Sequence, residues 1–202
     1  MQKKKNILEQ WHLTADELTQ IVDANPSLRG FMFGYIAEFQ LKKIFLSDVR
    51  ISNIHKYDDR DRTTGKKNDL CVTYKGYEFT IEVKSLQTAS IRRHPDRYVG
   101  FFQCDAGDSR YITLPNGDKV KTTCLQVGGF DMVAINLFAF RNQWEFGFAL
   151  NRDLPRSRHK YYTKEQQQYL LATSMEISLP LRSPFVDDPF VLLDQLINEK
   201  GR

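Results

Sequence analysis

The stretch FTIEVKSLQ, residues 79–87, has the pattern of a β-strand that carries two opposite charges near its end. Successive side chains of a strand point to opposite faces, so Glu82 and Lys84 share one face. The other face is apolar and is expected to enter a core through Phe79, Ile81 and Val83. A carboxylate beside an ammonium group, at the end of an otherwise buried strand, indicates that this face has a function.

The residues just upstream predict the other half of a β-hairpin. A strand over 69–74, DLCVTY, leads into Lys75-Gly76, and a two-residue turn there returns the chain antiparallel along 77–85. This turn sets Asp69 opposite Glu82, with Cβ atoms ~4.5–5.5 Å apart. The hairpin therefore brings together two acidic residues that are distant in the sequence.

Two carboxylates at this distance repel each other and raise a pKa unless a cation lies between them. Mg²⁺ takes oxygen ligands, often one or two protein carboxylates with water and substrate phosphate. A lysine beside that pair can orient or deprotonate a water, or stabilise charge that develops on phosphorus. Asp69, Glu82 and Lys84 together predict a metal and phosphate site.

The rest of the chain alternates helical and strand patterns. Helices are expected over 13–22, 27–45, 163–173 and 188–201, and strands over 49–54, 98–104, 130–140 and 144–150. The segment 110–125 has Asn116-Gly117 as a hairpin turn. This order favours an α/β protein with a mixed sheet and one domain over 1–202.

Composition narrows the class of protein further. The chain has 202 residues, of which 41% are hydrophobic and 27% charged, as in globular proteins. No apolar run approaches the ~18 residues of a membrane span, so no membrane partner is expected. The three cysteines form no CxxC pair, which argues against a disulfide framework or a zinc site and favours a reducing cytoplasm.

The pattern Asn68-Asp69, twelve residues, then Glu82-Val83-Lys84 resembles the PD-(D/E)XK nuclease superfamily, which includes many restriction endonucleases. The resemblance implies a restriction-endonuclease-like core, with helices flanking a central mixed β-sheet. It is closest over 28–87, the core helix and catalytic hairpin. The stretch 130–202 matches only as further strands and helices.

Two features depart from the family pattern. Asn68 stands where the family has proline, and 88–129 is rich in hairpin signals where the family has a crossover helix. Either a short helix lies within 85–93, or 88–129 is a hairpin-rich elaboration of the core.

The resemblance also implies residue roles. Asp69 and Glu82 would hold Mg²⁺, or Mn²⁺ in its place, with the backbone carbonyl of Val83 as a further ligand. Lys84 would position the attacking water, and Glu38 on the preceding helix would support the metal or the water. Two accessory candidates are Gln87 and His55.

Each assignment has a structural alternative. The hairpin could be a surface hairpin whose Asp69–Glu82 pair is relieved by a lysine. Glu38 could be an exposed helix residue paired with Lys42 at i+4. Gln87 could be an ordinary polar residue at a strand end, and His55 a structural or exposed histidine.

The function implied is a Mg²⁺-dependent endonuclease that hydrolyses duplex DNA, as in restriction of foreign DNA. A homodimer and a cognate methyltransferase are the protein partners considered. The alternatives are a repair or recombination nuclease that recognises DNA structure, and a non-catalytic DNA-binding module of the same fold. The net charge of +4 is small, so DNA binding requires clustered charge. Two clusters are candidates, unless they are a solvated rim: Arg92, Arg93 and Arg97, and Arg152, Arg156, Arg158 and Lys160.

Overall fold

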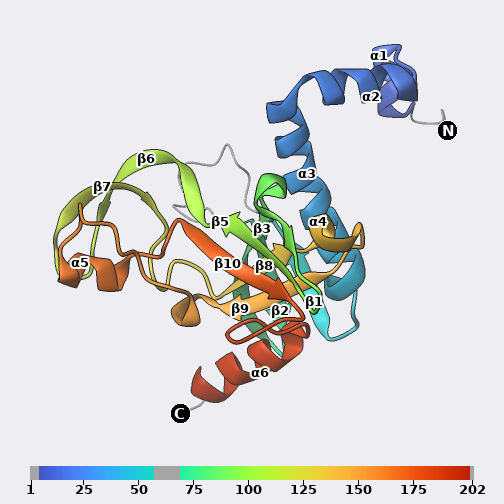
Figure 1. The fold of residues 1–202 in the computed structure, drawn as a ribbon. Coiled ribbons are helices and arrows are strands. Elements are labelled where there is room, and N and C mark those ends of the chain that lie inside the picture. The colour runs from blue at the N-terminus through green and yellow to red at the C-terminus, as the bar shows by residue number, and fades with distance from the viewer. Residues whose placement is uncertain (1–4, 57–68, 201–202) are drawn as a thin grey trace. The chain divides into compact units, whose positions relative to one another are not determined.

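The computed structural model describes residues 5–56 and 69–200 (Figure 1). It divides into two compact units, with the boundary between Ile36 and Ala37. The first unit contains α1 (Ile7–Trp11), α2 (Ala15–Ala24) and most of α3 (Pro26–Leu41). A capping box begins α2, because Thr14 and Glu17 exchange side-chain and backbone hydrogen bonds.

The second unit is built on a five-stranded mixed sheet in the order β1-β2-β3-β8-β9. Its strands are β1 (Ile51–His55), β2 (Leu70–Tyr74), β3 (Tyr77–Ser85), β8 (Met132–Asn136) and β9 (Phe146–Leu150). β3 and β8 run parallel, and the other neighbouring pairs are antiparallel. β3, which carries the motif, is therefore the central strand.

The predicted β2–β3 hairpin is confirmed in its register. Leu70 pairs with Ile81 and Tyr74 pairs with Tyr77, so the ladder leads directly to Asp69 and Glu82. Both turn residues have positive φ, 49° at Lys75 and 82° at Gly76, as a type I′ turn requires.

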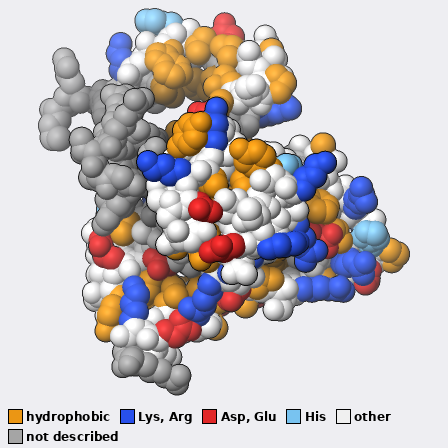
Figure 2. All heavy atoms as spheres, turned by 90° about the vertical axis from the view of Figure 1, so that its left-hand side faces the viewer, with side chains coloured by type: hydrophobic (Ala, Val, Ile, Leu, Met, Phe, Trp, Pro, Cys, Tyr) orange, Lys and Arg blue, Asp and Glu red, His pale blue; other side chains and the backbone are white. Residues whose placement is uncertain are grey.

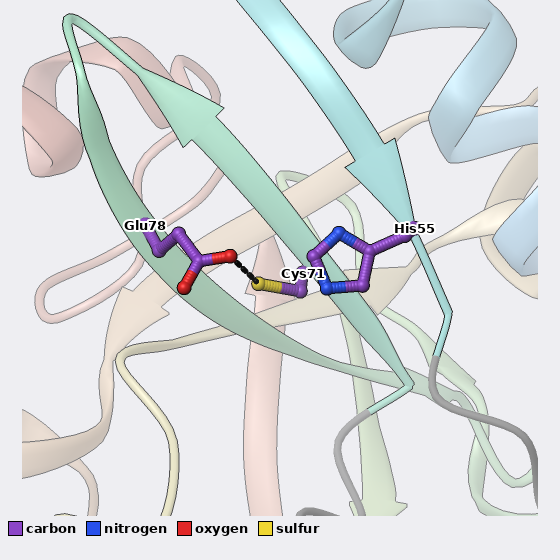
Figure 3. A group of neighbouring side chains, drawn as sticks. All are labelled: His55, Cys71 and Glu78. Carbon is purple, nitrogen blue, oxygen red and sulfur yellow. Dashed lines mark hydrogen bonds between the residues drawn. The ribbon is translucent and has the colours of Figure 1, made fainter.

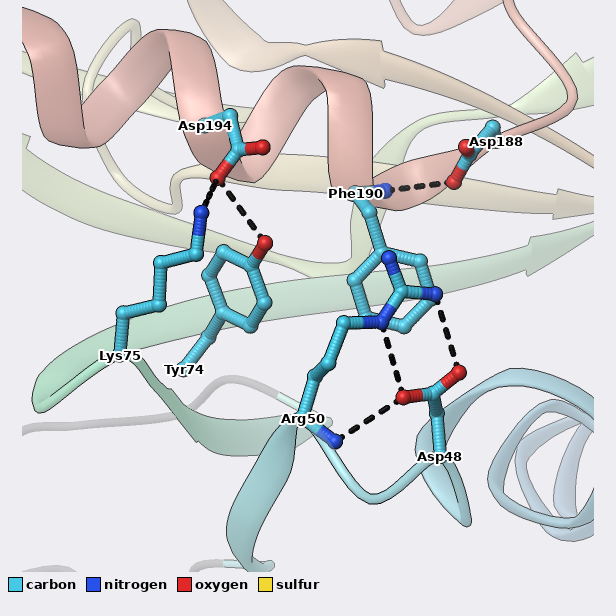
Figure 4. Close-up of polar contacts among 7 residues, drawn as sticks. All are labelled: Asp48, Arg50, Tyr74, Lys75, Asp188, Phe190 and Asp194. Carbon is cyan, nitrogen blue, oxygen red and sulfur yellow. Dashed lines mark hydrogen bonds and ion pairs between the residues drawn. The ribbon is translucent and has the colours of Figure 1, made fainter.

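One face of the sheet packs on helices. The end of α3, the π-helical turn η1 (Lys42–Leu46) and α6 (Pro189–Lys200) cover Val72, Ile81 and Phe148. Polar contacts attach α6 to the β2–β3 hairpin (Figure 4). Asp194 accepts hydrogen bonds from Tyr74 Oη at 2.9 Å and from Lys75 Nζ at 2.6 Å.

A second contact lies at the start of α6, where the Arg50 guanidinium carbon is 3.5 Å from the ring centroid of Phe190. Asp48 holds that guanidinium in place with hydrogen bonds to two of its nitrogens. These contacts attach α6 to the edge of the sheet at β1.

The other face packs on a second, three-stranded sheet in the order β10-β5-β4. Its strands are β4 (Arg92–Arg93), β5 (Tyr98–Gln103) and β10 (Ser174–Leu179), and the 3₁₀ turn η2 (Thr88–Ser90) precedes β4. A hairpin of β6 (Asp105–Thr113) and β7 (Lys119–Cys124) extends from β5 and packs on α5 (Lys164–Tyr169). The connection from β3 to β8 is made mainly by strands, and its helical part within 85–93 is the single 3₁₀ turn η2.

The predicted fold class is confirmed as a mixed α/β fold with helices, a five-stranded sheet and hairpins. The expected strand over 130–140 is too long, because β8 ends at Asn136 and α4 (Phe138–Arg141) follows. The Asn136 side chain accepts a hydrogen bond from the Phe138 backbone N–H and so supports the turn into α4. β10 was not expected, nor were α1, β4 and the short turn η3 (Asn151–Asp153).

Across the described ranges, no helix combines the length and apolar character that crossing a membrane requires. None of the three cysteines, all of which the structure describes, forms a disulfide. The expectation of a single domain over 1–202 stays a prediction.

Candidate active site

The central strand places Glu82 and Lys84 side by side between the two sheets. Glu82 is only 7% exposed, and its Oε1 lies 2.7 Å from Lys84 Nζ. Asp69, just before β2, accepts a hydrogen bond of 2.8 Å from the Val83 backbone N–H. The motif therefore lies in the interior of the unit, which does not fit the alternative of a solvated surface hairpin. Asn68 lies outside the described residues.

Glu38, near the end of α3, joins this group. Its pKa is raised, first by burial and also by the charge of Asp69. Its carboxylate accepts hydrogen bonds of 3.1 and 2.9 Å from Lys56 Nζ, next to the end of β1. Glu38 is thus a largely buried residue, and the expected alternative partner Lys42 contributes only a minor charge interaction.

Three carboxylates act on one another here. Burial raises the pKa of Glu82, Lys84 lowers it, and both Asp69 and Glu38 raise it again. The net direction is upward for both glutamates, which means that the charged forms of Glu38 and Glu82 are disfavoured in the folded protein. Electrostatic interaction thus links Glu38, Asp69 and Glu82, which the sequence separates widely.

Lys84 is held as a cation. Burial lowers the pKa of its ammonium group, but Glu82 and Asp69 outweigh that effect and raise the pKa above its ordinary value. Nζ also donates a 3.4 Å hydrogen bond to the Asp105 carbonyl at the start of β6. A lysine in this state donates hydrogen bonds and offers a positive charge to its neighbours.

The donor set suits a hard divalent cation. The carboxylates of Glu38, Asp69 and Glu82 face the ammonium groups of Lys56 and Lys84, which leaves one net negative charge. Mg²⁺ takes carboxylate oxygens, and its charge would favour the ionised forms of the two glutamates, which burial and carboxylate repulsion disfavour. Asp69 and Glu82 are therefore chemically fitted to hold the ion that the motif implies.

Two contributors were not evident in the sequence. Lys56 directly follows β1, and only the fold shows that it reaches Glu38. The 104–105 segment closes the site from the second sheet. Burial raises the pKa of the Cys104 thiol to about 12, although nearby Lys84 opposes this. An isolated bridge between Leu86, just after β3, and Phe102 of β5 brings the two segments together, which explains this proximity.

The two accessory candidates stand outside the contacts described above. Gln87 is exposed beyond the end of β3, and its backbone N–H donates to the Phe101 carbonyl. His55 lies on β1 beside Cys71 and Glu78 (Figure 3). The described contacts bring neither side chain to Glu82 or Lys84.

The two basic clusters lie at opposite ends of strand β10. Arg156 and Arg158 share a hollow with Ser174, at its start, whereas Arg93 and Arg97 share one with Leu179, at its end. The start of β10 pairs with the end of β5, next to Cys104 and hence to Lys84. Of the two, the cluster with Arg156 and Arg158 is therefore the one at the end of the second sheet where the candidate site lies.

Several of these arginines are already engaged. Arg152 forms an ion pair with Glu199 on α6. Arg156 donates hydrogen bonds to the backbone carbonyls of Leu154 and Arg152. Arg158 and Lys160 are exposed. The last two are therefore the members of their cluster best placed to meet a ligand.

The β6–β7 hairpin carries an exposed lysine–tyrosine pair that sequence reasoning missed. Tyr111 is 75% exposed, and Lys121, its partner across the hairpin, lies with Nζ 6.0 Å from the ring centroid. The opposite face of the hairpin packs on α5 through Val120 and Leu170. Figure 2 shows lysine and arginine side chains gathered on the side of the molecule that carries this hairpin.

Comparison with known proteins gives one distant structural similarity. No protein-family model matches the chain, and no curated protein does. The solved structure of a bacterial homing endonuclease, I-Ssp6803I, is similar with a TM-score of 0.35 and 16% sequence identity, over 71% of this chain and 87% of that chain. Because this similarity is distant, the chemistry of the site is derived from the residues of this chain.

Proposed function

We propose that this protein is a metal-dependent endonuclease that hydrolyses phosphodiester bonds of duplex DNA. One observation carries the proposal: Glu38 on α3, Asp69 before β2, and Glu82 and Lys84 on β3 interact electrostatically in one largely buried group. Burying several charged groups costs stability, and groups with perturbed pKa values gather at functional sites. The DNA substrate is proposed because a hard-cation donor set lies near the end of the second sheet that carries the exposed Arg158 and Lys160.

Asp69 and Glu82 hold Mg²⁺, or Mn²⁺ in its place, and the Val83 carbonyl is a further ligand in this proposal. The chemistry that a bound ion supplies is polarisation of the phosphodiester. Glu38 accepts a hydrogen bond from the attacking water and orients it. Lys84 donates hydrogen bonds and offers its charge to the phosphate as negative charge develops, which accords with its raised pKa.

Restriction of foreign DNA is the biological role that we propose. Such an enzyme cleaves one unmethylated duplex sequence and is blocked when a cognate methyltransferase modifies that sequence. A repair or recombination nuclease would instead cleave branched or damaged DNA without regard to sequence. Comparing the cleavage rates of unmethylated, methylated and branched DNA distinguishes the two roles. The oligomeric state of the enzyme, monomer or homodimer, is measured alongside.

The experiment is incubation of the purified protein with plasmid DNA in Mg²⁺, in Mn²⁺ and in EDTA. We expect cleavage with either metal and none in EDTA. Lys84→Ala should cut ~10²–10⁴-fold more slowly, because it removes one electrostatic interaction with the transition state, while DNA binding survives.

Asp69→Asn should be inactive and folded, since an asparagine oxygen can still accept the Val83 N–H. A matched control is Asp194→Asn, an acidic residue on α6 outside the site. Cleavage by Asp69→Asn at the wild-type rate, or a Lys84→Ala effect below about tenfold, would contradict the assignment.

A further inference from the structure

A second cluster of metal-binding side chains lies on the central sheet. His55, Cys71 and Glu78 stand on β1, β2 and β3, three adjacent strands. His55 pairs directly with Cys71, so both side chains point to the same face of the sheet. Figure 3 shows the imidazole of His55 and the carboxylate of Glu78 on either side of the Cys71 sulfur.

The distances within this cluster suit metal coordination. One nitrogen of His55, the sulfur of Cys71 and one carboxylate oxygen of Glu78 all lie within 4.8 Å of one another. The Cys71 thiol donates to Glu78 Oε1 with an S···O distance of 3.6 Å. Tetrahedral Zn²⁺, with Zn–S of ~2.3 Å and Zn–O of ~2.1 Å, sets those two atoms ~3.6 Å apart. The sulfur and oxygen are therefore already at the separation that a shared ion requires.

We propose that His55, Cys71 and Glu78 form a binding site for a thiophilic divalent ion, Zn²⁺ in the first place. The ion takes the position of the thiol proton between sulfur and carboxylate, and that proton leaves to solvent when the thiolate binds the metal. Three protein ligands leave a fourth tetrahedral position for water. Glu78 is exposed, so the ion enters from its side of the cluster.

This site differs in chemistry from the carboxylate site. Sulfur and imidazole ligands select Zn²⁺ and similar ions, whereas oxygen ligands alone suit Mg²⁺. Cys71 follows Asp69 by two residues, which is ~7 Å along a strand. Two ions of different class would thus bind next to each other on the same face of the hairpin. The sequence was expected to hold no zinc site because it lacks a CxxC pair. That signal cannot detect this cluster, since its ligands meet across three strands and not along one segment.

The test uses Co²⁺, which replaces Zn²⁺ in tetrahedral sites and gives a thiolate-to-metal absorption band. We expect wild-type protein to bind one equivalent with this band, and added Zn²⁺ to abolish it by displacement. Glu78→Gln, a change at an exposed residue, should weaken binding at least tenfold, and Cys71→Ser should abolish the band. Zn²⁺ should also raise the Tm of wild type and leave the Tm of Cys71→Ser unchanged.

Two control variants make the outcome specific. Cys124→Ser alters another buried cysteine that packs in a different cluster, and it should keep the band. Asp69→Asn should keep it too, so that failure of the proposed nuclease site and failure of this site are separate results. No thiolate band in wild type, or equal binding by wild type and Glu78→Gln, overturns the proposal.

Discussion

Asp69 connects the backbone of the hairpin with the charges of the site. It accepts a hydrogen bond from the Val83 N–H, and its charge acts on Glu38, Glu82 and Lys84. Two of these interactions are repulsive and one is attractive. In the metal-free protein the carboxylate therefore disfavours the ionised state of its acidic neighbours, as expected where a cation would bind between them.

Asp69→Asn should for this reason stabilise the metal-free protein at neutral pH. Because the pKa values of Glu38 and Glu82 are raised, the folded state holds these protons more tightly than the unfolded chain, and stability falls as pH rises above the ordinary value of 4.5. The substitution removes part of that penalty, roughly 1 kcal/mol or a Tm increase of about 2–4 °C. Thermal unfolding in EDTA measures it, and the gain should shrink as pH falls towards 4.5.

Asp194→Asn is the control with the opposite sign. Lys75 lowers the pKa of Asp194, so its contribution to stability is present above its ordinary value of 3.8 and is lost as pH falls. The variant should therefore be less stable than wild type at neutral pH and equal to it in acid. A lower Tm for Asp69→Asn at neutral pH would show that its attraction to Lys84 outweighs both repulsions.

The residues of the motif could be predicted from sequence because strand geometry is strictly periodic. The spacing of Asp69 and Glu82 about Lys75-Gly76 predicts their register, and the structure has that register in the adjoining pairs. Lys56 could not be predicted, since its contact with Glu38 depends on where β1 and α3 meet in space. The same holds for His55, Cys71 and Glu78, which are separated along the chain and adjacent only across the sheet.

At the scale of elements, the turn at Lys75-Gly76 could be predicted from the sequence, but the division of a long apolar run could not. The run 130–140 divides into β8 and α4 because Asn136 supports a turn within it. β10 alternates apolar and polar residues and is followed directly by Pro180, but its place beside β5, far away in the sequence, follows only from the pairing of the two strands. That pairing also decides which basic cluster is near the site.

The position of β10 predicts unequal roles for the two basic clusters. Arg158→Glu with Lys160→Glu should weaken binding of every duplex alike, because interactions with phosphates carry no sequence information. The plot of log affinity against log salt should also flatten, by ~0.9 for each DNA phosphate that the variant no longer neutralises. Binding measured by fluorescence anisotropy over a range of salt concentrations gives both quantities.

Arg92→Glu with Arg93→Glu is the matched control, since it reverses the same charge on β4. The step along β5 from Val99, which pairs with Arg92, to Cys104 is roughly 17 Å at ~3.3 Å per residue. This variant should bind DNA nearly as wild type does. If it alone had reduced affinity, the DNA-binding face would lie at the opposite end of the second sheet.

At the scale of the whole molecule, stability comes from the part of the chain that begins at Ala37. The main clusters of buried apolar side chains draw all their described members from that part. In contrast, no side chain of α1 or α2 is buried, and Trp11 is 58% exposed. Hydrophobic stabilisation is proportional to the apolar area removed from water, so these two helices contribute little to it.

A chain that starts at Pro26 should therefore unfold cooperatively with a Tm within about 2–4 °C of the full-length protein, the shift expected for ~1 kcal/mol at this size. Pro26 is a suitable start because proline is favoured in the first turn of a helix, and α3 stays whole. Calorimetry of both chains in the same buffer measures the difference.

Deleting α6 from Pro189 onward is the matched control, since it removes a shorter stretch that includes the buried Phe190, Leu192 and Leu193. That variant should lose its cooperative transition, because each large apolar side chain removed from a core costs about 2–5 kcal/mol. A fall of more than ~10 °C in the chain that starts at Pro26 would mean that the residues before it belong to the same cooperative unit. The single domain expected over 1–202 would then hold, and the boundary at Ala37 would not separate independently stable parts.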